Sequence, residues 1–492
     1  MNKFTQVSRG GYASRPNKPP LRTPGETRQS ASAAVVLIGA DIFAIELALG
    51  LAWAVRSALS PWWPISIGSD QMLALAEGLM IMPAAYYLVG LHPGYGLGPV
   101  ERLRKRVLTT TVVFGILISW DRLVGNGDWS RGVLLLTFGF ALILVPTFEA
   151  LARRILILCR RWGNPVAIFG ASETGVKVAK MLQANPLLGW VPIGFLDDRV
   201  QKREGRVEPV EILGGIDEAK LLCPSAQRVI IAIPNASAAR LNEIISRGPF
   251  TDVTIIPNLI GFQTLWVSAQ DLNGILGLSV KRNLLLPHNR LVKRITDVVL
   301  GGTAFVFALP IIGLFALLVK IIDPGPAFCR QERIGEHGQS FKMLKLRSMR
   351  ADAEQWLVDY LARNSQAREE WTRYMKLRND PRILPIVGKL MRMLSIDELP
   401  QLWHVIRGDM SLVGPRPFPE YHVAQFDPDF RHLRTSVRPG LTGLWQVSSR
   451  SEGDLKVQEM QDTYFIRNWS PWLELYVLIQ TFYAVLGAKG AR

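Results

Sequence analysis

The chain has 492 residues, and its 48% hydrophobic content with 14 tryptophans disfavours a wholly soluble protein and is typical of one whose helices cross a bilayer. The formal net charge of +16 requires an anionic partner, and with membrane segments expected, lipid headgroups or phosphorylated substrates are favoured over nucleic acid. The three widely spaced cysteines form no CxxC pair, which excludes a zinc ribbon or a disulfide framework as the basis of the fold.

The first 160 residues consist of a polar tail and four apolar runs. Residues 1–32 are basic and rich in Pro, Gly and Ser, and are predicted to be a disordered cytosolic tail rather than a signal peptide. Residues 33–160 are predicted to contain four transmembrane helices, because they hold apolar runs at 33–53, 72–91, 107–120 and 133–155. Basic residues gather in the tail, between the second and third runs, and after the fourth. The positive-inside rule therefore places both ends of this module in the cytosol.

Two acidic residues, Asp41 and Glu46, lie inside the first apolar run. An acid within a membrane segment is a functional hypothesis by default, because burying its charge is costly. The competing interpretation, which we favour, is that these side chains pack against another helix or reach toward the interface.

Residues 161–280 alternate strand and helix patterns, which predicts a parallel, doubly wound sheet in a Rossmann-like α/β domain. A strand at 166–169 enters the glycine loop that starts at Gly170, and a second strand ends at Asp197. A glycine loop followed by an acid about twenty residues later is the dinucleotide-binding pattern. Ser172, however, replaces the glycine that lets the backbone approach a pyrophosphate. A structural or regulatory domain without nucleotide is therefore favoured over one that binds NAD(H) or CoA.

Residues 281–322 are predicted to be a linker and a further membrane helix. The apolar run 298–319 is long enough to span a bilayer, but basic residues flank it on both sides. Pro310 lies near its middle, where a proline removes a backbone hydrogen bond and bends the helix. These features predict a re-entrant helix that enters the inner leaflet, bends at Pro310 and returns. The alternative is an ordinary fifth span, which would place all later residues outside the cell.

A basic segment and an acidic pair follow this helix. Glycines and basic residues alternate before Lys345 and Arg347, which suits either a hairpin that presents cations to phosphate or a solvated basic face. Asp397 and Glu398 precede a helical apolar pattern. Because Pro400 fits only a first turn, the helix is expected to begin at the acidic pair, whose carboxylates its dipole would keep ionised.

The acidic pair has two interpretations. Acids are common in first turns for structural reasons alone, and Ser395 and Glu398 have the spacing of a capping box. An ionised Asp397 can instead attack phosphorus while Glu398 holds Mg²⁺. Arginines in the surrounding segments favour the second interpretation. They are Arg392, Arg416 between two prolines, and Arg438 before a proline–glycine turn.

Together these segments resemble the bacterial sugar transferases called polyprenyl-phosphate glycosylphosphotransferases, or monotopic phosphoglycosyl transferases. The four N-terminal spans and the Rossmann-like domain extend the resemblance to the large members of that family. The segments that carry it are Lys293-Arg294 with Asp297, Gln331-Glu332-Arg333, Lys345-Leu346-Arg347-Ser348-Met349, Asp397-Glu398-Leu399-Pro400-Gln401-Leu402, Gly408 to Pro417 and Pro439 to Val447.

The resemblance implies a multi-pass enzyme of the bacterial inner membrane with its Rossmann-like and catalytic domains in the cytoplasm. It implies transfer of hexose-1-phosphate from UDP-hexose to undecaprenyl phosphate, with release of UMP, as the first membrane step of O-antigen, capsule or exopolysaccharide synthesis. Galactose is the expected sugar and glucose the alternative. Inner-membrane lipids and a second copy of the chain, in a homodimer, are the other expected partners, and nucleic acid is not expected.

The resemblance also implies roles for individual residues. Asp397 is expected to be the nucleophile that carries the phosphosugar, and Glu398 to bind the cofactor Mg²⁺. The residues expected to bind substrate are Lys345, Arg347, Arg392, Arg416 and Arg438. Residues 323–492 are expected to form a mixed, mainly α catalytic domain that ends in an interfacial helix within 469–486. A nucleotide- or redox-sensing membrane protein and a non-catalytic scaffold of polysaccharide export are the alternative functions.

Overall fold

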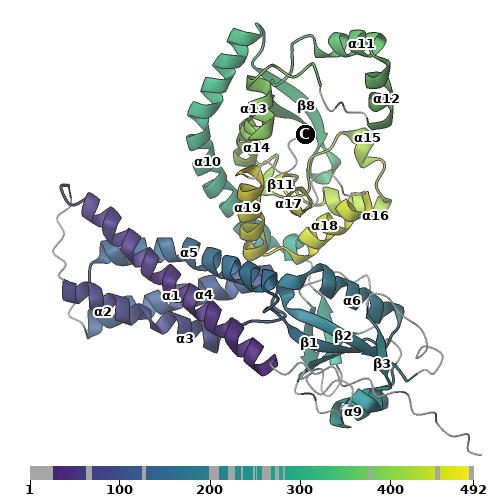
Figure 1. The fold of residues 1–492 in the computed structure, drawn as a ribbon. Helices are drawn as coiled ribbons and strands as arrows, with labels where there is room; N and C mark the ends of the chain where they lie inside the picture. The colour runs from purple at the N-terminus through teal and green to yellow at the C-terminus, as the bar shows by residue number, and fades with distance from the viewer. Residues whose placement is uncertain are drawn as a thin grey trace, which may run out of the picture. The chain divides into compact units, whose positions relative to one another are not determined.

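The computed structural model describes residues 26–62, 69–124, 129–198, 210–219, 228–233, 236–247, 250, 252–256, 267–271, 276–280, 283–374, 377, 380–448 and 455–486. The chain forms two compact units, Met1–Ile260 and Gly261–Arg492 (Figure 1). Most of the predicted tail lies outside the described residues. Its last residues, from Glu26, already belong to the first helix, so the predicted boundary at residue 32 is too late.

The first unit contains the predicted membrane helices and the α/β domain. Its helices are α1 (Glu26–Ala58), α2 (Ser69–Leu79), α3 (Ile81–Leu88), α4 (Pro99–Leu123), α5 (Arg131–Leu158), α6 (Glu173–Ala184) and α9 (Ala238–Arg247), with 3-10 turns η1 (Pro186–Leu188) and η2 (Ile216–Glu218). Its strands are β1 (Asn164–Phe169), β2 (Trp190–Leu196), β3 (Ile212–Gly214), β4 (Arg228–Ile231) and β5 (Asp252–Ile255).

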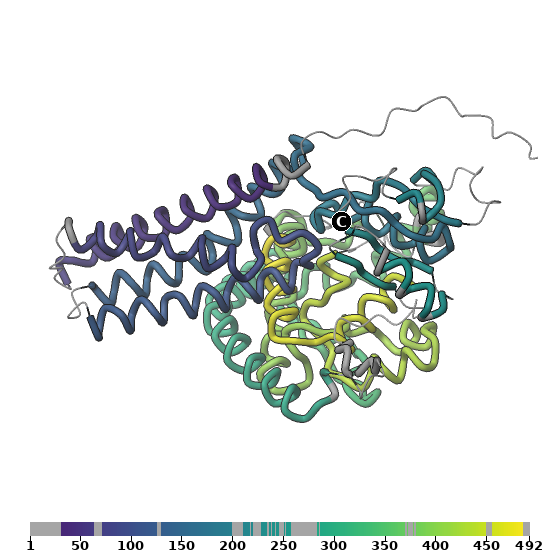
Figure 2. The backbone as a smooth tube through the Cα atoms, turned by 90° about the horizontal axis from the view of Figure 1, so that it is seen from below, coloured from purple at the N-terminus to yellow at the C-terminus, as the bar shows by residue number. Residues whose placement is uncertain are grey.

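All four predicted apolar runs are helical, and the second is broken into α2 and α3 at Met80. The break lies just before Pro83, which has no amide hydrogen for the Leu79 carbonyl and whose ring would collide with that carbonyl in a continuous helix. In the described part of this unit, Ala31–Ala58 and Arg131–Leu158 are long and apolar enough to cross a membrane. The helices α1 to α5 run alongside one another in both views (Figures 1 and 2). A module of four spans stays a prediction.

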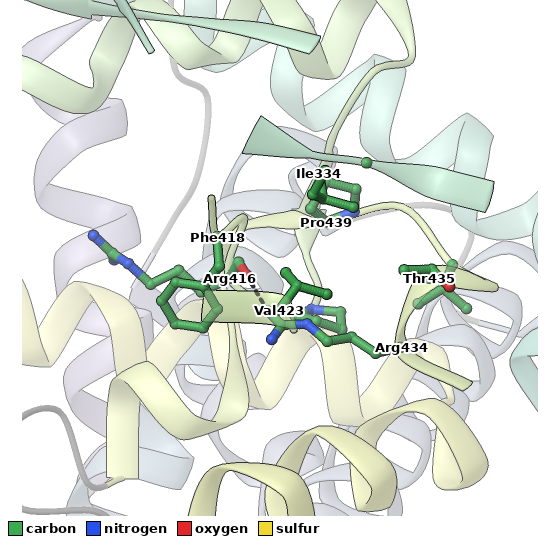
Figure 3. Close-up of a pocket in the computed structure, with 10 residues that line it drawn as sticks. Ile334, Arg416, Phe418, Val423, Arg434, Thr435 and Pro439 are labelled. Carbon is green, nitrogen blue, oxygen red and sulfur yellow. Dashed lines mark hydrogen bonds between the residues drawn. The ribbon is translucent and has the colours of Figure 1, made fainter. Parts of the chain in front are cut away.

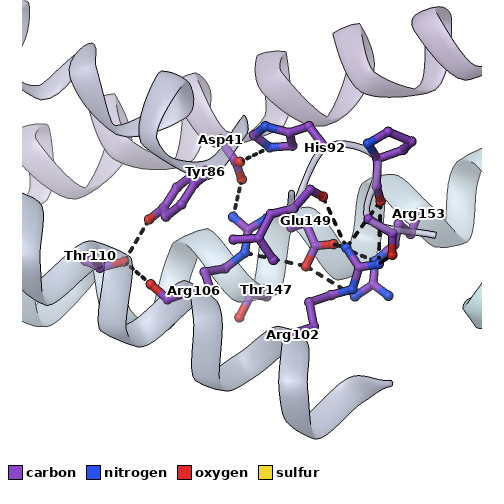
Figure 4. A network of polar contacts seen from close by, with 12 residues as sticks. Asp41, Tyr86, His92, Arg102, Arg106, Thr110, Thr147, Glu149 and Arg153 are labelled. Atoms are coloured by element: carbon purple, nitrogen blue, oxygen red, sulfur yellow. Dashed lines mark hydrogen bonds and ion pairs between the residues drawn. The ribbon is translucent and has the colours of Figure 1, made fainter. Parts of the chain in front are cut away.

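A buried polar network joins α1, α4 and α5 (Figure 4). Asp41 accepts a hydrogen bond from Arg106 at 2.6 Å and lies 2.7 Å from the His92 ring. Glu149 accepts from Arg102 at 3.0 Å and pairs with Arg153 at 2.7 Å. The favoured interpretation of Asp41, helix packing, is therefore confirmed.

The α/β domain has the predicted parallel sheet, with strand order β3-β2-β1-β4-β5. Strand β1 lies at its centre, and its residues from Pro165 to Phe169 are buried. Such near-continuous apolar strands are expected when helices cover both faces of a parallel sheet.

The second unit contains a long apolar helix and the remaining predicted site residues. Its strands are β6 (Val267–Asp271), β7 (Leu276–Val280), β8 (Phe328–Ile334), β9 (Ser340–Leu346), β10 (Ser411–Val413) and β11 (Gly440–Thr442), with 3-10 turns η3 (Asn283–Leu285), η4 (Glu336–Gly338) and η5 (Ile396–Gln401). Its helices are α10 (Pro287–Ile322), α11 (Ala353–Arg363), α12 (Ser365–Tyr374), α13 (Val387–Met393), α14 (Leu402–Arg407), α15 (Glu420–Val423), α16 (Pro428–Thr435), α17 (Leu444–Ser448), α18 (Leu455–Asn468) and α19 (Pro471–Leu486). The predicted mixed, mainly α composition is confirmed.

Helix α10 is continuous through Pro310 and is curved (Figure 1). One face of it packs on the rest of the unit along most of its length. The buried residues of that face are Lys293, Asp297, Gly301, Ala308, Ile312, Phe315 and Val319. The opposite face exposes large apolar side chains, among them Phe307 at 74% exposure. The helix is long and apolar enough to cross a membrane, so length and composition alone allow both the re-entrant and the spanning interpretation.

Candidate active site

The acidic pair lies in the 3-10 turn η5, which runs directly into α14. Pro400 falls inside this turn, as expected, but the turn begins at Ile396, before the predicted start at Asp397 or Glu398, and α-helical geometry begins only at Leu402. The predicted capping box does not form. Ser395 has a left-handed φ of 55° and its side chain makes no cap, while the Glu398 amide bonds to the Ser395 carbonyl at 3.2 Å. The Glu398 carboxylate is thereby free to face β9.

Two cations hold the Glu398 carboxylate. Lys345 donates to Oε1 at 2.8 Å, and Arg416 donates to the same oxygen at 3.3 Å. The side chains of Lys345 and Glu398 are only 15% and 21% exposed, so water screens this pair weakly. Burial by itself would raise the pKa of Glu398, but Arg416 and Lys345 together lower that pKa to about 2. Glu398 is therefore ionised throughout the physiological pH range.

Asp397 has the opposite shift. Burial raises the pKa of its carboxyl and the adjacent Glu398 carboxylate raises it further, against the lowering effects of Lys345 and Arg392. The helix dipole was expected to lower both pKa values, but the pKa of Glu398 is lowered by Arg416 and Lys345, and that of Asp397 shifts upward. Desolvation and a neighbouring negative charge outweigh a dipole as short as this turn provides. A carboxylate of raised pKa is a better base and a better nucleophile once it is ionised.

Arg392 supports Asp397 from α13. Its Nε donates to Ser348 Oγ at 3.0 Å, which fixes the guanidinium at the end of β9. Its positive charge lowers the pKa of Asp397. Three of the five predicted substrate-binding residues, Lys345, Arg392 and Arg416, therefore surround the acidic pair.

The other two predicted substrate-binding residues make structural ion pairs elsewhere. Arg347 is 6% exposed and donates to Asp323 at 2.8 Å, which ties the end of α10 to β9. Arg438 donates to Glu336 at 3.1 Å beside the β8–β9 turn. Substrate binding by Arg347 and Arg438 stays a prediction.

Arg434, which the sequence patterns did not single out, braces the loop that carries Arg416 (Figure 3). Its guanidinium donates to the Arg416 carbonyl and lies over the rings of Phe418 and Phe426, 4.7 and 5.0 Å from their centroids. Arg416, Phe418 and Arg434 line a small pocket, and the Arg416 side chain extends away from Arg434 (Figure 3). Arg434 lies on α16, outside every short motif recognised in the sequence. Its contact with Arg416, 18 residues earlier, could not be predicted from a local pattern.

The two carboxylates suit a Mg²⁺ ion whose other ligands come from substrate phosphates. Within the described residues, no cluster of three or more His, Cys, Asp or Glu side chains could hold a metal by itself. Mg²⁺ bound together with substrate phosphates needs only one or two protein carboxylates. Both cations contact Glu398 Oε1, and Oε2 makes no hydrogen bond to any described residue. The donor set therefore suits a metal that arrives with a diphosphate.

The glycine loop of the α/β domain is closed by its own side chains. Ser172 caps α6 through the Gly175 amide, and its hydroxyl donates to the Ala232 carbonyl at 2.9 Å. Asp197, in the position of the acid that would bind a ribose, is 4% exposed and accepts from the Ala171 amide at 3.0 Å. The two groups that a dinucleotide would need are therefore engaged within the domain.

Comparisons with known proteins agree with this arrangement. A family model described as bacterial sugar transferase matches residues 288–488, and one described as a CoA-binding domain matches residues 97–256. Over 404 residues the chain is 32% identical to the undecaprenyl-phosphate galactose phosphotransferase of Salmonella typhimurium, which covers 79% of this chain and 82% of that protein. Over 489 residues it is 28% identical to the UDP-glucose:undecaprenyl-phosphate glucose-1-phosphate transferase of Xanthomonas campestris pv. campestris, covering 94% and 96%.

A shorter relative matches less than half of the chain. The exopolysaccharide production protein ExoY of Rhizobium meliloti is 41% identical over 206 residues, which make up 42% of this chain and 90% of that protein.

Proposed function

The chain belongs to the bacterial sugar transferase family, and we propose that it transfers hexose-1-phosphate from a UDP-hexose to undecaprenyl phosphate, with release of UMP. The observation that carries the proposal is the unequal acidic pair. Glu398 is held ionised by Lys345 and Arg416, while Asp397 beside it has a raised pKa and accepts no hydrogen bond from another described side chain.

The first step uses Asp397 as a nucleophile. A carboxylate oxygen attacks the sugar-linked phosphorus, and the bond from that phosphorus to the bridging oxygen breaks. UMP leaves with the bridging oxygen and the electron pair, and an acyl phosphate links Asp397 to the sugar. The charges of Lys345, Arg392 and Arg416 stabilise the phosphate oxygens as negative charge develops on the leaving group.

In the second step an oxygen of undecaprenyl phosphate attacks the same phosphorus. The bond to Asp397 breaks and the carboxylate is restored, so no proton or electron is consumed overall. Glu398, aided by Asp397 before attack, would hold a Mg²⁺ that supplies charge neutralisation on the diphosphate. Fixing Glu398 in its ionised form is then the task of Lys345 and Arg416.

The attachment of α10 supports the re-entrant topology. Near its start, Lys293 donates to Glu474 at 2.9 Å and Asp297 accepts from the Leu412 amide at 2.9 Å. At its end, Asp323 accepts from Arg347 at 2.8 Å. Both ends are thus fixed to the same compact unit, and a helix that crossed the bilayer would place contacts of that one unit on opposite sides of the membrane.

We further expect an inner-membrane protein whose two soluble parts face the cytosol, where UDP-sugars are available. The C-terminal helix α19 exposes Phe482 and Tyr483, as an interfacial helix would. A homodimer is also expected, and cross-linking in native membranes tests it.

The sugar is expected to be galactose, following the relative from Salmonella typhimurium, and glucose is the alternative, following the relative from Xanthomonas campestris. For the Rossmann-like domain we expect no bound dinucleotide, because Ser172 and Asp197 are engaged internally. Calorimetric titration of the purified protein with NADH and with CoA tests this, and micromolar binding of either would contradict it.

The activity is tested with the full chain in lipid nanodiscs, supplied with Mg²⁺, undecaprenyl phosphate, and either UDP-galactose or UDP-glucose. We expect UMP and a lipid-linked sugar diphosphate with at least one of the two sugars. Absence of UMP with both sugars would contradict the proposed reaction and favour the scaffold alternative, whereas UMP formation that survives Asp397→Asn unchanged would contradict the role of Asp397 as the nucleophile.

A further inference from the structure

A buried histidine connects α14 to the strand that carries Lys345. His404 is 6% exposed, and its ring contacts β9 on one side and the turn after α14 on the other. The Leu344 amide donates to His404 Nε2 at 3.1 Å, and His404 Nδ1 lies 2.8 Å from Asp409 Oδ2. The Phe341 ring packs edge-on against the imidazole at 5.5 Å between centroids.

These two hydrogen bonds determine the protonation of the ring. A backbone amide can only donate, so Nε2 must accept and cannot carry a hydrogen. The Asp409 carboxylate can only accept, so Nδ1 carries the hydrogen. His404 is therefore a neutral imidazole with one assigned tautomer, and both of its nitrogens are satisfied.

The turn after α14 fixes Asp409 in place. The amides of Gly408, Asp409 and Met410 all donate to the His404 carbonyl, at 2.9, 3.0 and 3.1 Å. Gly408 has a φ of 102°, which only glycine adopts without strain. Arg294 of α10 donates to the Val405 carbonyl at 2.7 Å just before this turn. The imidazole is consequently oriented by a rigid support.

On its other side, the His404 ring accepts a hydrogen bond at the edge of β9 that does not pair with β8. Strands β8 and β9 form a two-stranded sheet in which Leu344 faces Arg330, so the second edge of β9 has no strand partner in the described sheet. An unpaired edge amide that is partly buried is costly unless an acceptor meets it. His404 Nε2 is that acceptor, and the next residue along the strand is Lys345.

We propose that His404 is a positioning residue for the transfer reaction. By holding the Leu344 amide, it fixes the end of β9 so that Lys345 reaches Glu398 Oε1 at 2.8 Å. This role rests on the proposed function, because it acts through the cation that keeps Glu398 ionised beside Asp397.

Two substitutions separate the acceptor role from simple packing. His404→Leu keeps apolar bulk but removes the acceptor, whereas His404→Gln places an amide oxygen near the position of Nε2. We expect His404→Leu to lower kcat roughly 10- to 100-fold through displacement of Lys345, with KM for the UDP-hexose changed by less than about threefold. His404→Gln should recover most of that loss.

A double-mutant cycle tests the route through Lys345. In a Lys345→Met background, His404→Leu should lower kcat by less than about threefold, because the interaction through which it acts is already absent. In the control background Lys342→Met, an exposed lysine of the same strand, the full effect of His404→Leu should remain. Equal losses in both backgrounds, or equal losses for the Leu and Gln variants, would overturn the proposal.

Hydrogen–deuterium exchange measures the protection of the Leu344 amide in β9 and does not depend on an activity assay. Exchange at the Leu344 amide should accelerate in His404→Leu and stay near wild type in His404→Gln, at matched thermal unfolding midpoints. If the wild-type protein releases no UMP, the proposed reaction fails. If instead Leu344 remains protected in His404→Leu, the positioning role fails.

Discussion

The ammonium group of Lys345 lies 2.8 Å from Glu398 Oε1, so β9 and η5 meet in a charge-assisted hydrogen bond directly beside Asp397. Two adjacent carboxylates in a partly buried site cannot both ionise without compensation. Here the cations contact Glu398, and the raised pKa falls on Asp397. The positions of Lys345 and Arg416 therefore support the division of labour that we propose, with Asp397 as nucleophile and Glu398 as metal ligand.

Replacing Glu398 by Gln should remove the negative charge that we propose holds Mg²⁺, and it should leave Lys345 without its carboxylate partner. We expect kcat to fall by ~10²–10³-fold and the dependence of activity on Mg²⁺ concentration to flatten. Asp352→Asn is the control, because that carboxylate is 56% exposed and pairs only with Arg350 in the described structure. Magnesium titrations of both variants check the prediction, and an unchanged magnesium requirement in Glu398→Gln would contradict it.

The proposed reaction at the cytosolic face of the membrane requires that both ends of α10 face the cytosol. In a cysteine-free background, His288→Cys and Arg330→Cys should both react with a membrane-impermeant maleimide only from the cytosolic side of sealed vesicles. Trp62→Cys, in the connection between the first two predicted spans, should react only from the opposite side. Reaction of Arg330→Cys from the same side as Trp62→Cys would favour a spanning α10 and contradict the re-entrant helix.

The buried polar network of α1, α4 and α5 gives a matched pair of arginines on α4. Arg106 is 1% exposed between Asp41 and Glu149, whereas the Arg104 side chain is 41% exposed and pairs with Glu101. Arg106→Met leaves the buried Asp41 carboxylate with His92 as its remaining described partner and should cost roughly 3–5 kcal/mol of stability, while Arg104→Met should cost less than about 1 kcal/mol. Thermal unfolding in detergent distinguishes them, and equal melting temperatures would contradict the structural role of the network.

Asp462, on α18, provides a test by pH. Burial raises the pKa of its carboxyl to about 6, although Arg434 and Gln458 lower it. A folded-state pKa above the unfolded value means that its contribution to stability is present at low pH and is lost as pH rises through about 6. Between pH 4 and pH 7, the stability of Asp462→Asn relative to wild type should therefore increase. A stability difference that is independent of pH would contradict this assignment.

Local patterns predicted the elements of this fold well, because their causes are local. The parallel sheet, the position of Pro400 in a first turn and the apolar helix around Pro310 follow from periodicity and from the geometry of proline. Pro83 could have predicted the break at Met80 in the same way, but the long apolar run was interpreted as one helix.

The partners of charged side chains could not be predicted in this way. Arg347 and Lys345 are two residues apart in one basic segment, yet one pairs with Asp323 and the other with Glu398. Asp41 and Arg106 are 65 residues apart, and no pattern in either helix names the other. Such pairs depend on tertiary packing, which brings distant segments together only after the elements have formed.

The covalent step at Asp397 is tested most directly by intact-protein and peptide mass spectrometry. The purified protein is incubated with UDP-hexose and Mg²⁺ in the absence of undecaprenyl phosphate. We predict a hexose-phosphate adduct on the peptide containing Asp397 that disappears when undecaprenyl phosphate is added and is missing in Asp397→Asn. Turnover without any such adduct, with rapid quenching to trap it, would contradict a covalent intermediate and would indicate direct attack by the lipid phosphate.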